Sequence, residues 1–361
     1  MKKAFFILLV FLPTVLLSQQ KAGHLILVTL DGLRWQEVFG GMDSAIANNP
    51  KFNQQDSAYI FKKYWHPELD RRRELLMPFL WSVVKEKGQI WGNRKYGNRV
   101  DNANPHWFSY PGYSEMLTGF ADSSINSNDF AANPHVTVLE FLNRQPSLRG
   151  KVAAFTAWDA FDRILNERRA GFPVVAAFDS AGGARPNAAE RLINRLKWEA
   201  YRPFHDYECL DVFTHYAAFE HLRARRPRVL YIAYGETDEW AHAGQYRDYL
   251  NAAKQVDDWL RQLWNFVQSD PQYRNRTAMF VTVDHGRGDR VKEEWTSHNS
   301  KIADSHEIWF AVVGPGVRPG GEMKETTQIY QKQIAATLAR LLGYRYRAAH
   351  PVANGIDEIF R

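Results

Sequence analysis

Apolar and polar residues follow two distinct patterns along this chain. Short apolar runs rich in Val, Ile, Leu and Phe recur between polar segments and predict buried strands. The clearest runs lie at 24–32, 151–158, 228–238, 278–286 and 307–316. Longer stretches between them, at 244–267 and 327–343, have the period of amphipathic helices. This alternation predicts an α/β fold with a mostly parallel central sheet and helices on both faces.

Two polar segments, near 42–75 and 164–205, lack a clear period and are rich in charged residues, Pro and Gly. We expect both to be insertions over the active-site face. The rest of the sequence shows no boundary, so we expect one catalytic domain over 19–361.

The first residues, 1–18, have the pattern of a signal peptide. Lys2 and Lys3 precede an apolar run that ends at Leu17, and the small residue Ser18 follows. The run is shorter than the about 20 residues that cross a bilayer. We therefore expect an exported protein, periplasmic or secreted, without a stable membrane anchor.

Composition limits the possible partners. The chain has 46 Lys and Arg against 40 Asp and Glu, and its formal charge of +6 falls to +4 without the two signal lysines (44 against 40). This mild excess suits small anionic substrates, and we expect no nucleic-acid binding. Cys209 is the single cysteine, so an intrachain disulfide is excluded.

Acidic residues stand at the ends of three predicted strands. They are Asp31, Asp238 and Asp284. Each one alone could simply begin a turn. In open α/β sheets, however, ligands bind beyond the carboxyl ends of the strands, where these side chains would gather.

Histidines accompany two of these acids. His242 follows Asp238 by four residues, so the two share one face of a helical turn. His285 directly follows Asp284, and His298 lies in the polar stretch "WTSHNSK". Carboxylate oxygen and imidazole nitrogen are ligands that suit zinc. His306 is a competitor of His298 at the start of a predicted strand.

A serine stands in the stretch "NPHWFSYPGYSEMLTG", residues 104–119. We expect the Pro and Gly of "YPGY" to impose a turn after Ser109, with a helix from Ser114 as its N-cap. Ser109 would then be exposed near helix N-terminal amides that can hold an anion. The alternative is an ordinary loop serine.

In this order, the residues resemble the alkaline phosphatase superfamily, and most closely its type I phosphodiesterase/nucleotide pyrophosphatase branch. The resemblance rests on "LDGLR", "SYPGYSEMLTG", Asp238–x3–His242, "DHG" and a final histidine before a strand that ends in "GP". It runs from about 24 to 343. Two departures are Asn299 after His298, where the branch usually has Gly, and Ser rather than Thr at the nucleophile position.

The resemblance implies two divalent cations, with zinc as the expected metal, and a serine nucleophile. Asp31, Asp284 and His285 would hold one cation together with the Ser109 oxygen. Asp238, His242 and His298 would hold the other. The predicted strand 278–286, which ends in "VTVDHG", would then end on charged groups because a cation is their partner.

We therefore expect an exported phosphoric ester hydrolase that acts through a phospho-serine on a small phosphorylated substrate, a nucleotide or another phosphodiester. A phosphomonoesterase or phosphomutase is the alternative in the same superfamily. A sulfatase is disfavoured because "SYPGY" lacks the Arg of the C/S-x-P-x-R pattern. A non-catalytic binding protein is disfavoured because the nucleophile and all six ligands are present.

Other residues near these motifs have two interpretations each. Arg34, Arg287 and Arg290 could bind phosphate oxygens or be solvated loop residues. Tryptophans could stack on a base or sugar ring, or support the site from behind; they are Trp35, Trp107, Trp240 and Trp295.

Overall fold

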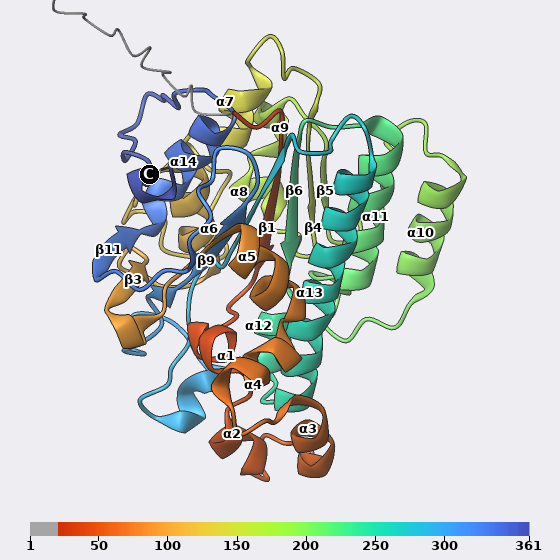
Figure 1. Ribbon diagram of the computed structural model, residues 1–361. Coiled ribbons are helices and arrows are strands. Elements are labelled where there is room, and N and C mark those ends of the chain that lie inside the picture. The colour runs from red at the N-terminus through yellow and green to blue at the C-terminus, as the bar shows by residue number, and fades with distance from the viewer. Residues whose placement is uncertain (1–20, 361) are drawn as a thin grey trace, which may run out of the picture.

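A computed structural model describes residues 21–360 and shows an eight-stranded central sheet (Figure 1). The strand order is β10-β2-β9-β7-β1-β6-β4-β5. In that order the strands are Gly321–Glu322, Gly88–Trp91, Phe310–Val313, Thr277–Thr282, His24–Leu30, Val229–Tyr234, Val152–Thr156 and Val174–Ala176. A second sheet has the order β11-β3-β8, with strands Thr327–Tyr330, Asn98–Asp101 and Glu307–Ile308.

The centre of the large sheet is parallel. β1 pairs in parallel with β6 and β7, and β6 pairs in parallel with β4. β9 is the exception, since it is antiparallel to both β7 and β2. Every residue of β1, β6, β7 and β4 is buried, as expected for strands covered on both faces. The predicted fold class is confirmed.

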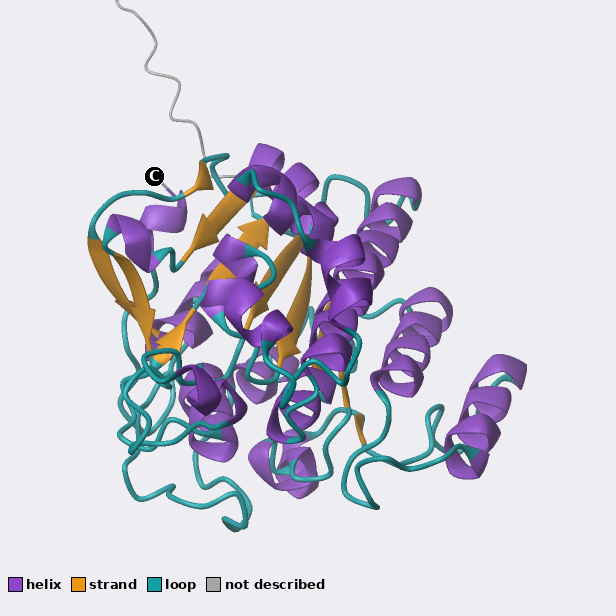
Figure 2. Ribbon diagram, turned by 90° about the horizontal axis from the view of Figure 1, so that it is seen from below, coloured by secondary structure: helices purple, strands orange, loops and turns teal. Residues whose placement is uncertain are grey.

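Helices cover both faces of this sheet (Figure 2). On one face Tyr231 of β6 meets Phe161, which in turn packs on Tyr113 of helix α6, Ser109–Thr118. On the other face Tyr234 meets Trp259 of α13, Tyr246–Ser269, and bonds to His215 of α11, Asp211–Arg225. Two such layers leave the carboxyl ends of the strands as the accessible edge.

The remaining helices are mostly short. The α-helices are α1 Trp35–Gly40, α2 Ser44–Asn48, α3 Ser57–Tyr64, α4 Leu69–Leu76, α5 Lys85–Lys87, α7 Val138–Asn143, α8 Phe161–Ile164, α9 Glu167–Ala170, α10 Ala188–Glu199, α12 Glu236–His242 and α14 Ile334–Leu341. Short 3-10 or π turns are η1 Leu80–Val84, η2 Arg94–Tyr96, η3 Lys292–Thr296, η4 Gln331–Gln333 and η5 Asp357–Phe360.

Several predicted boundaries are wrong. The run 307–316 is two strands in different sheets, β8 and β9, with Trp309 between them. The predicted helix 327–343 begins as strand β11, and α14 starts only at Ile334. The predicted strand 228–238 ends at Tyr234, so Asp238 lies in α12 rather than at a strand end. Periodicity alone does not distinguish a short buried strand from a helix.

The two polar segments differ in structure. Segment 42–75 forms α2, α3 and most of α4, whereas segment 164–205 contributes β5 to the edge of the central sheet. The second segment is therefore part of the scaffold as well as a covering loop. The predicted signal peptide, 1–18, lies outside the described residues. Among the described helices, none is long and apolar enough to cross a membrane.

The predicted turn at "YPGY" is also wrong, because helix α6 already begins at Ser109. Pro is tolerated in a first helical turn, where its missing N–H would have no partner. Gly112 is required by packing, since a Cβ there would lie 2.4 Å from the carbonyl oxygen of Asp284. Ser114 is a buried mid-helix residue whose Oγ accepts a hydrogen bond from Asn133 at 3.0 Å, and it is no N-cap.

We predict that Gly112→Ala lowers the free energy of unfolding by about 1–3 kcal/mol, because the added methyl forces α6 away from the end of β7. Urea unfolding followed by circular dichroism measures this change. Gly40→Ala is the matched control, since a Cβ at Gly40 meets nothing within 4 Å. Equal unfolding midpoints for the two variants would contradict the close approach.

Candidate metal centre

Two buried acids and a histidine meet where β1 and β7 end. Asp31 follows β1, and Asp284 and His285 follow β7 by two residues. Nε2 of His285 lies 3.2 Å from Oδ1 of Asp31 and 3.3 Å from Oδ2 of Asp284. β1 and β7 are hydrogen-bonded neighbours, so their ends place these side chains together.

A second group lies beside the first, on α12 and the loop after η3. Asp238 and His242 share one face of α12, with Oδ2 and Nε2 3.1 Å apart. Nε2 of His298 lies 2.9 Å from Nε2 of His242 and 3.7 Å from Oδ1 of Asp238. The rings of His285 and His298 stack with centroids 3.9 Å apart, which joins the two groups.

Ser109 stands at the first position of α6 and faces these groups. Its Oγ lies 3.3 Å from Nε2 of His285. The positive end of the helix dipole favours negative charge at this position. The structure therefore brings together all seven residues that the sequence singled out. His306 lies elsewhere, with its ring against Trp107 and its Nε2 4.0 Å from Asp101.

Burial and the charges of neighbouring residues set the pKa values of the three carboxyl groups. Burial, and then the charge of Asp238, raise the pKa of Asp31. Burial, and then the charge of Asp31, raise the pKa of Asp284 well above its ordinary value. Asp238 differs: burial opposes its ionisation, but Arg287, His242 and His298 together outweigh burial and hold its pKa well below the usual range.

The two stacked histidines differ in protonation. Burial opposes the charge on His285, but Asp284, Asp31 and Asp238 outweigh it and raise its pKa to about 9. Burial and the charge of His285 lower the pKa of His298 well below its ordinary value. The acidic residues hold a proton on the central imidazole of His285. A bound cation can take the place of this proton and balance the same carboxylates.

The residues present fit divalent cations. Oδ1 of Asp31 and Oδ2 of Asp284 are buried and accept no well-formed hydrogen bond from the described residues. The described residues form two sets of three possible ligands, and within each set the ligand atoms lie within 4.8 Å of one another. The sets are Asp31, Asp284 and His285, and Asp238, His285 and His298. Oxygen and nitrogen donors at this spacing match the preferences of zinc and similar metals.

Each of the three arginines that could bind phosphate or be solvated has a carboxylate partner in the structure. Arg34 is fully buried and paired with Glu37. Arg287 is also fully buried, and its Nη2 donates to the backbone oxygen of Asp238 at 3.1 Å and to its carboxylate. Arg290 is exposed and paired with Asp304 at 2.9 Å. Both buried guanidiniums serve the scaffold instead.

The structure shows two residues that bond to the candidate site or next to it and that the sequence analysis did not identify. The hydroxyl of Tyr113 donates to Oδ2 of Asp31 at 3.0 Å, one helical turn beyond Ser109. Oδ1 of Asn128 accepts a hydrogen bond at 3.0 Å from the backbone N–H of Tyr110, the residue after Ser109. Tyr113 has a signal in the sequence, its i+4 spacing from Ser109, but Asn128 stands in a loop without a pattern.

The tryptophans divide by their contacts. Trp295 is fully buried and packs edge-to-face on Phe52, Tyr246 and Tyr249. Trp35 and Trp240 donate hydrogen bonds to Glu307 and Glu236. These contacts agree with support from behind rather than with a stacking surface. The ring of Trp107 packs on His306, centroids 4.8 Å apart.

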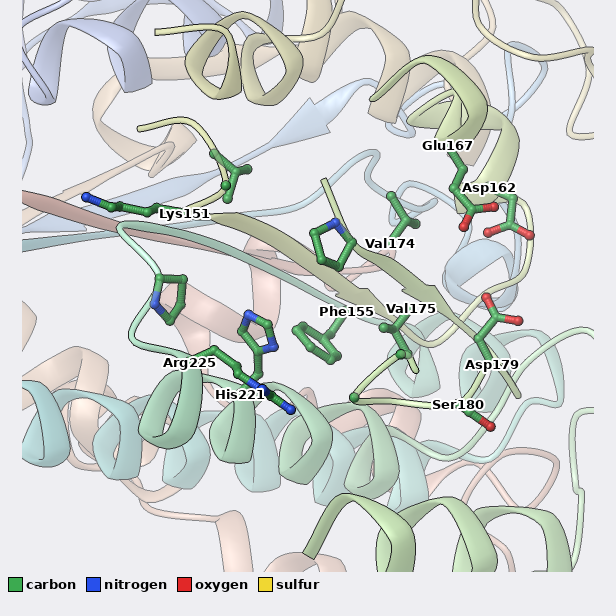
Figure 3. A pocket seen from close by; sticks show the side chains of 16 residues that line it. Lys151, Phe155, Asp162, Glu167, Val174, Val175, Asp179, Ser180, His221 and Arg225 are labelled. Carbon is green, nitrogen blue, oxygen red and sulfur yellow. The ribbon is translucent and has the colours of Figure 1, made fainter. Parts of the chain in front are cut away.

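A cavity of about 710 Å³ lies away from this centre, between β4, β5 and α11 (Figure 3). Phe155 and His221 face it, with acidic side chains at one end and Lys151 at the other. None of the seven candidate residues lines it. The chemistry therefore belongs to the strand ends and not to this cavity.

Comparison with known proteins agrees with this geometry. The family model described as "Metalloenzyme superfamily" matches residues 213–346. That stretch contains five of the six candidate ligands, Asp31 being the exception. No curated protein matches the sequence.

Solved structures resemble nearly the whole chain. Alkaline phosphatase PafA has a TM-score of 0.61 at 10% identity, covering 94% of this chain and 99% of that one. The lipoteichoic acid synthase LtaP from Listeria monocytogenes has 0.57 at 13%, with 94% and 76% covered. The phosphonate monoester hydrolase SpPMH from Silicibacter pomeroyi has 0.51 at 12%, with 89% and 73% covered.

These likenesses confirm the resemblance to the alkaline phosphatase superfamily without choosing a branch. The chain has the fold of the alkaline phosphatase superfamily and carries the sequence pattern of the metalloenzyme superfamily over residues 213–346.

Proposed function

We propose that this chain is an exported phosphodiesterase of the nucleotide pyrophosphatase type, with Ser109 as its nucleophile. The observation that carries the proposal is the position of Ser109: its hydroxyl stands at a helix N-terminus and 3.3 Å from His285, beside two groups of metal-type ligands. Asp31, Asp284 and His285 would hold one zinc ion. Asp238, His242 and His298 would hold the other.

The chemistry follows from these positions. Two bound cations would lower the pKa of the serine hydroxyl and neutralise charge that develops on the phosphoryl oxygens. Ser109 Oγ loses its proton and attacks phosphorus, the bond to the leaving alcohol oxygen breaks, and that oxygen takes up a proton. The resulting phospho-serine still carries the second ester group of the diester. Water then attacks this phosphorus, releases the phosphomonoester and returns the proton to Ser109.

Charge favours a diester over a monoester. A phosphomonoester is largely dianionic at neutral pH, and a diester carries one negative charge. Arg34 and Arg287 already pair with Glu37 and Asp238, so a carboxylate balances the charge of each guanidinium. Glu208 and Glu239 also lie near Asp238 and form no ion pair with described residues. This surrounding suits a monoanionic substrate such as a nucleotide diester.

We predict about two zinc ions per chain by elemental analysis of the purified protein, the number that a two-metal displacement site holds. The loaded protein should hydrolyse bis-p-nitrophenyl phosphate faster than p-nitrophenyl phosphate or p-nitrophenyl sulfate in kcat/KM. A preference for the monoester would support the phosphatase alternative, and a preference for the sulfate ester a sulfatase. Fewer than two ions after zinc supplementation would contradict the ligand sets.

We predict that Ser109→Ala lowers kcat by about 10³-fold or more while zinc content stays unchanged, because the attacking oxygen is lost. Ser109→Thr keeps a hydroxyl and should retain much more activity. Ser114→Ala on the same helix is the control and should stay active, since Ser114 bonds to Asn133 and not to the centre. Full turnover by Ser109→Ala would refute a serine nucleophile.

The pKa of His285 predicts how the metal-free protein responds to pH. Its folded-state pKa of about 9 lies above the ordinary 6.5, so its stabilisation is present below pH 6.5 and is lost as pH rises through 9. The raised pKa values of Asp31 and Asp284 act in the same direction.

The melting temperature of metal-depleted protein should therefore fall by several degrees between pH 6.5 and 9. Zinc-loaded protein should show a much smaller change, because no proton is then needed to balance the carboxylates. Differential scanning calorimetry of both forms, with His285→Gln as the variant that lacks this proton, measures the difference. Identical pH profiles for the two forms would contradict the proposed cation site.

A further inference from the structure

Helix α10 is held to the rest of the molecule by polar contacts. It stands at the outside, beyond α11 (Figures 1 and 2). Nζ of the buried Lys197 donates to the carbonyl oxygen of Ala177 at 2.7 Å. The side-chain amide of Asn194 bonds to the backbone of Ala181 at 2.9 and 3.0 Å. Ile193 also packs against the core from α10. The inward face of α10 is therefore largely polar, with one apolar side chain.

Its apolar side chains point into solvent instead. The exposed fractions are 52% for Leu192, 47% for Leu196 and 55% for Trp198, and 84% for Tyr201 just beyond the helix. Leu192 and Leu196 are one turn apart on the same face. A helix that packs on its own core has the opposite arrangement. These four side chains therefore contribute little to the stability of this chain.

Arginines lie beside this apolar surface. Arg191 and Arg195 are exposed on α10, and Arg202 lies over the ring of Trp198 at 4.9 Å. Among the described residues Arg195 forms no ion pair, and Arg202 pairs with Asp206. Glu199, the one exposed acid of the helix, stands three residues after Leu196 and shares its face. The exposed residues of α10 beside the leucines therefore carry an excess of positive charge, two arginines against one acid.

We propose that α10, together with Tyr201 and Arg202, docks on the surface of a bilayer that contains anionic lipid. Leucines would enter the boundary between headgroups and acyl chains, Trp198 and Tyr201 would lie at headgroup level, and the arginines would bind lipid phosphates. This inference is independent of the proposed catalytic function.

A second copy of the chain fits this surface less well. The twelve residues of α10 span only about 18 Å, and a stable interface buries roughly 800 Å² on each partner. In a two-fold pair the arginines of one copy would also face those of the other, which is unfavourable. A bilayer with anionic lipid offers apolar contacts to the leucines and negative charge to the arginines.

The test is co-sedimentation of the purified protein with vesicles of phosphatidylcholine alone or mixed equally with phosphatidylglycerol, at low and high salt. We expect binding to the mixed vesicles that weakens with salt. Leu192→Gln/Leu196→Gln should lower the partition coefficient about ten-fold or more. Arg191→Gln/Arg195→Gln should lower it by a similar factor on mixed vesicles and remove most of the salt dependence.

The matched control is Leu75→Gln, which alters an exposed leucine on α4 and should bind as the unaltered protein does. Gln keeps helix propensity, and the melting temperature of each variant checks that the fold is intact. Failure of the unaltered protein to bind mixed vesicles would overturn the proposal. So would unchanged binding by Leu192→Gln/Leu196→Gln, or a dimer in sedimentation velocity that this variant abolishes without any vesicle binding.

Discussion

Three buried carboxylates at one edge of a parallel sheet are the constraint on which this structure depends. The charge of Asp238 raises the pKa of Asp31, and the charges of Asp31 and Asp238 raise the pKa of Asp284. Burial makes each charge costly without a partner. Arg287 balances only Asp238, and one proton on His285 balances part of the rest. Bound cations are the partners that such a site requires.

The packing of the buried strands, rather than contacts among the acidic side chains, fixes the positions of these carboxylates. β1, β6 and β7 are buried throughout and adjacent in the sheet, so their ends cannot move independently. Gly112 lets α6 approach the end of β7, and this contact fixes Ser109 against His285. A rigid arrangement of this kind is what a displacement at phosphorus needs, since small misplacements of a nucleophile cost much rate.

The arginines show how burial changes a residue's role. In the sequence Arg34, Arg287 and Arg290 stand beside the motifs and look equivalent. In the structure the first two are buried and paired, and the third is a solvated surface residue. A similar inversion occurs on α10, where Lys197 is buried and Leu196 is exposed. Residue type alone predicts neither case, because the position of each helix face relative to the core decides it.

The sequence by itself determined the parallel α/β core and the residues that gather beyond its strands. Apolar runs that end in Asp31 and Asp284–His285, and the Asp238–x3–His242 spacing, are local patterns that can be read along the chain. Only the tertiary structure decided between His298 and His306, because both stand in polar surroundings before a strand and only the packing of the loop after η3 brings one of them to Asp238. It also decided the roles of Tyr113 and Asn128, whose partners are distant in sequence or lack any local pattern.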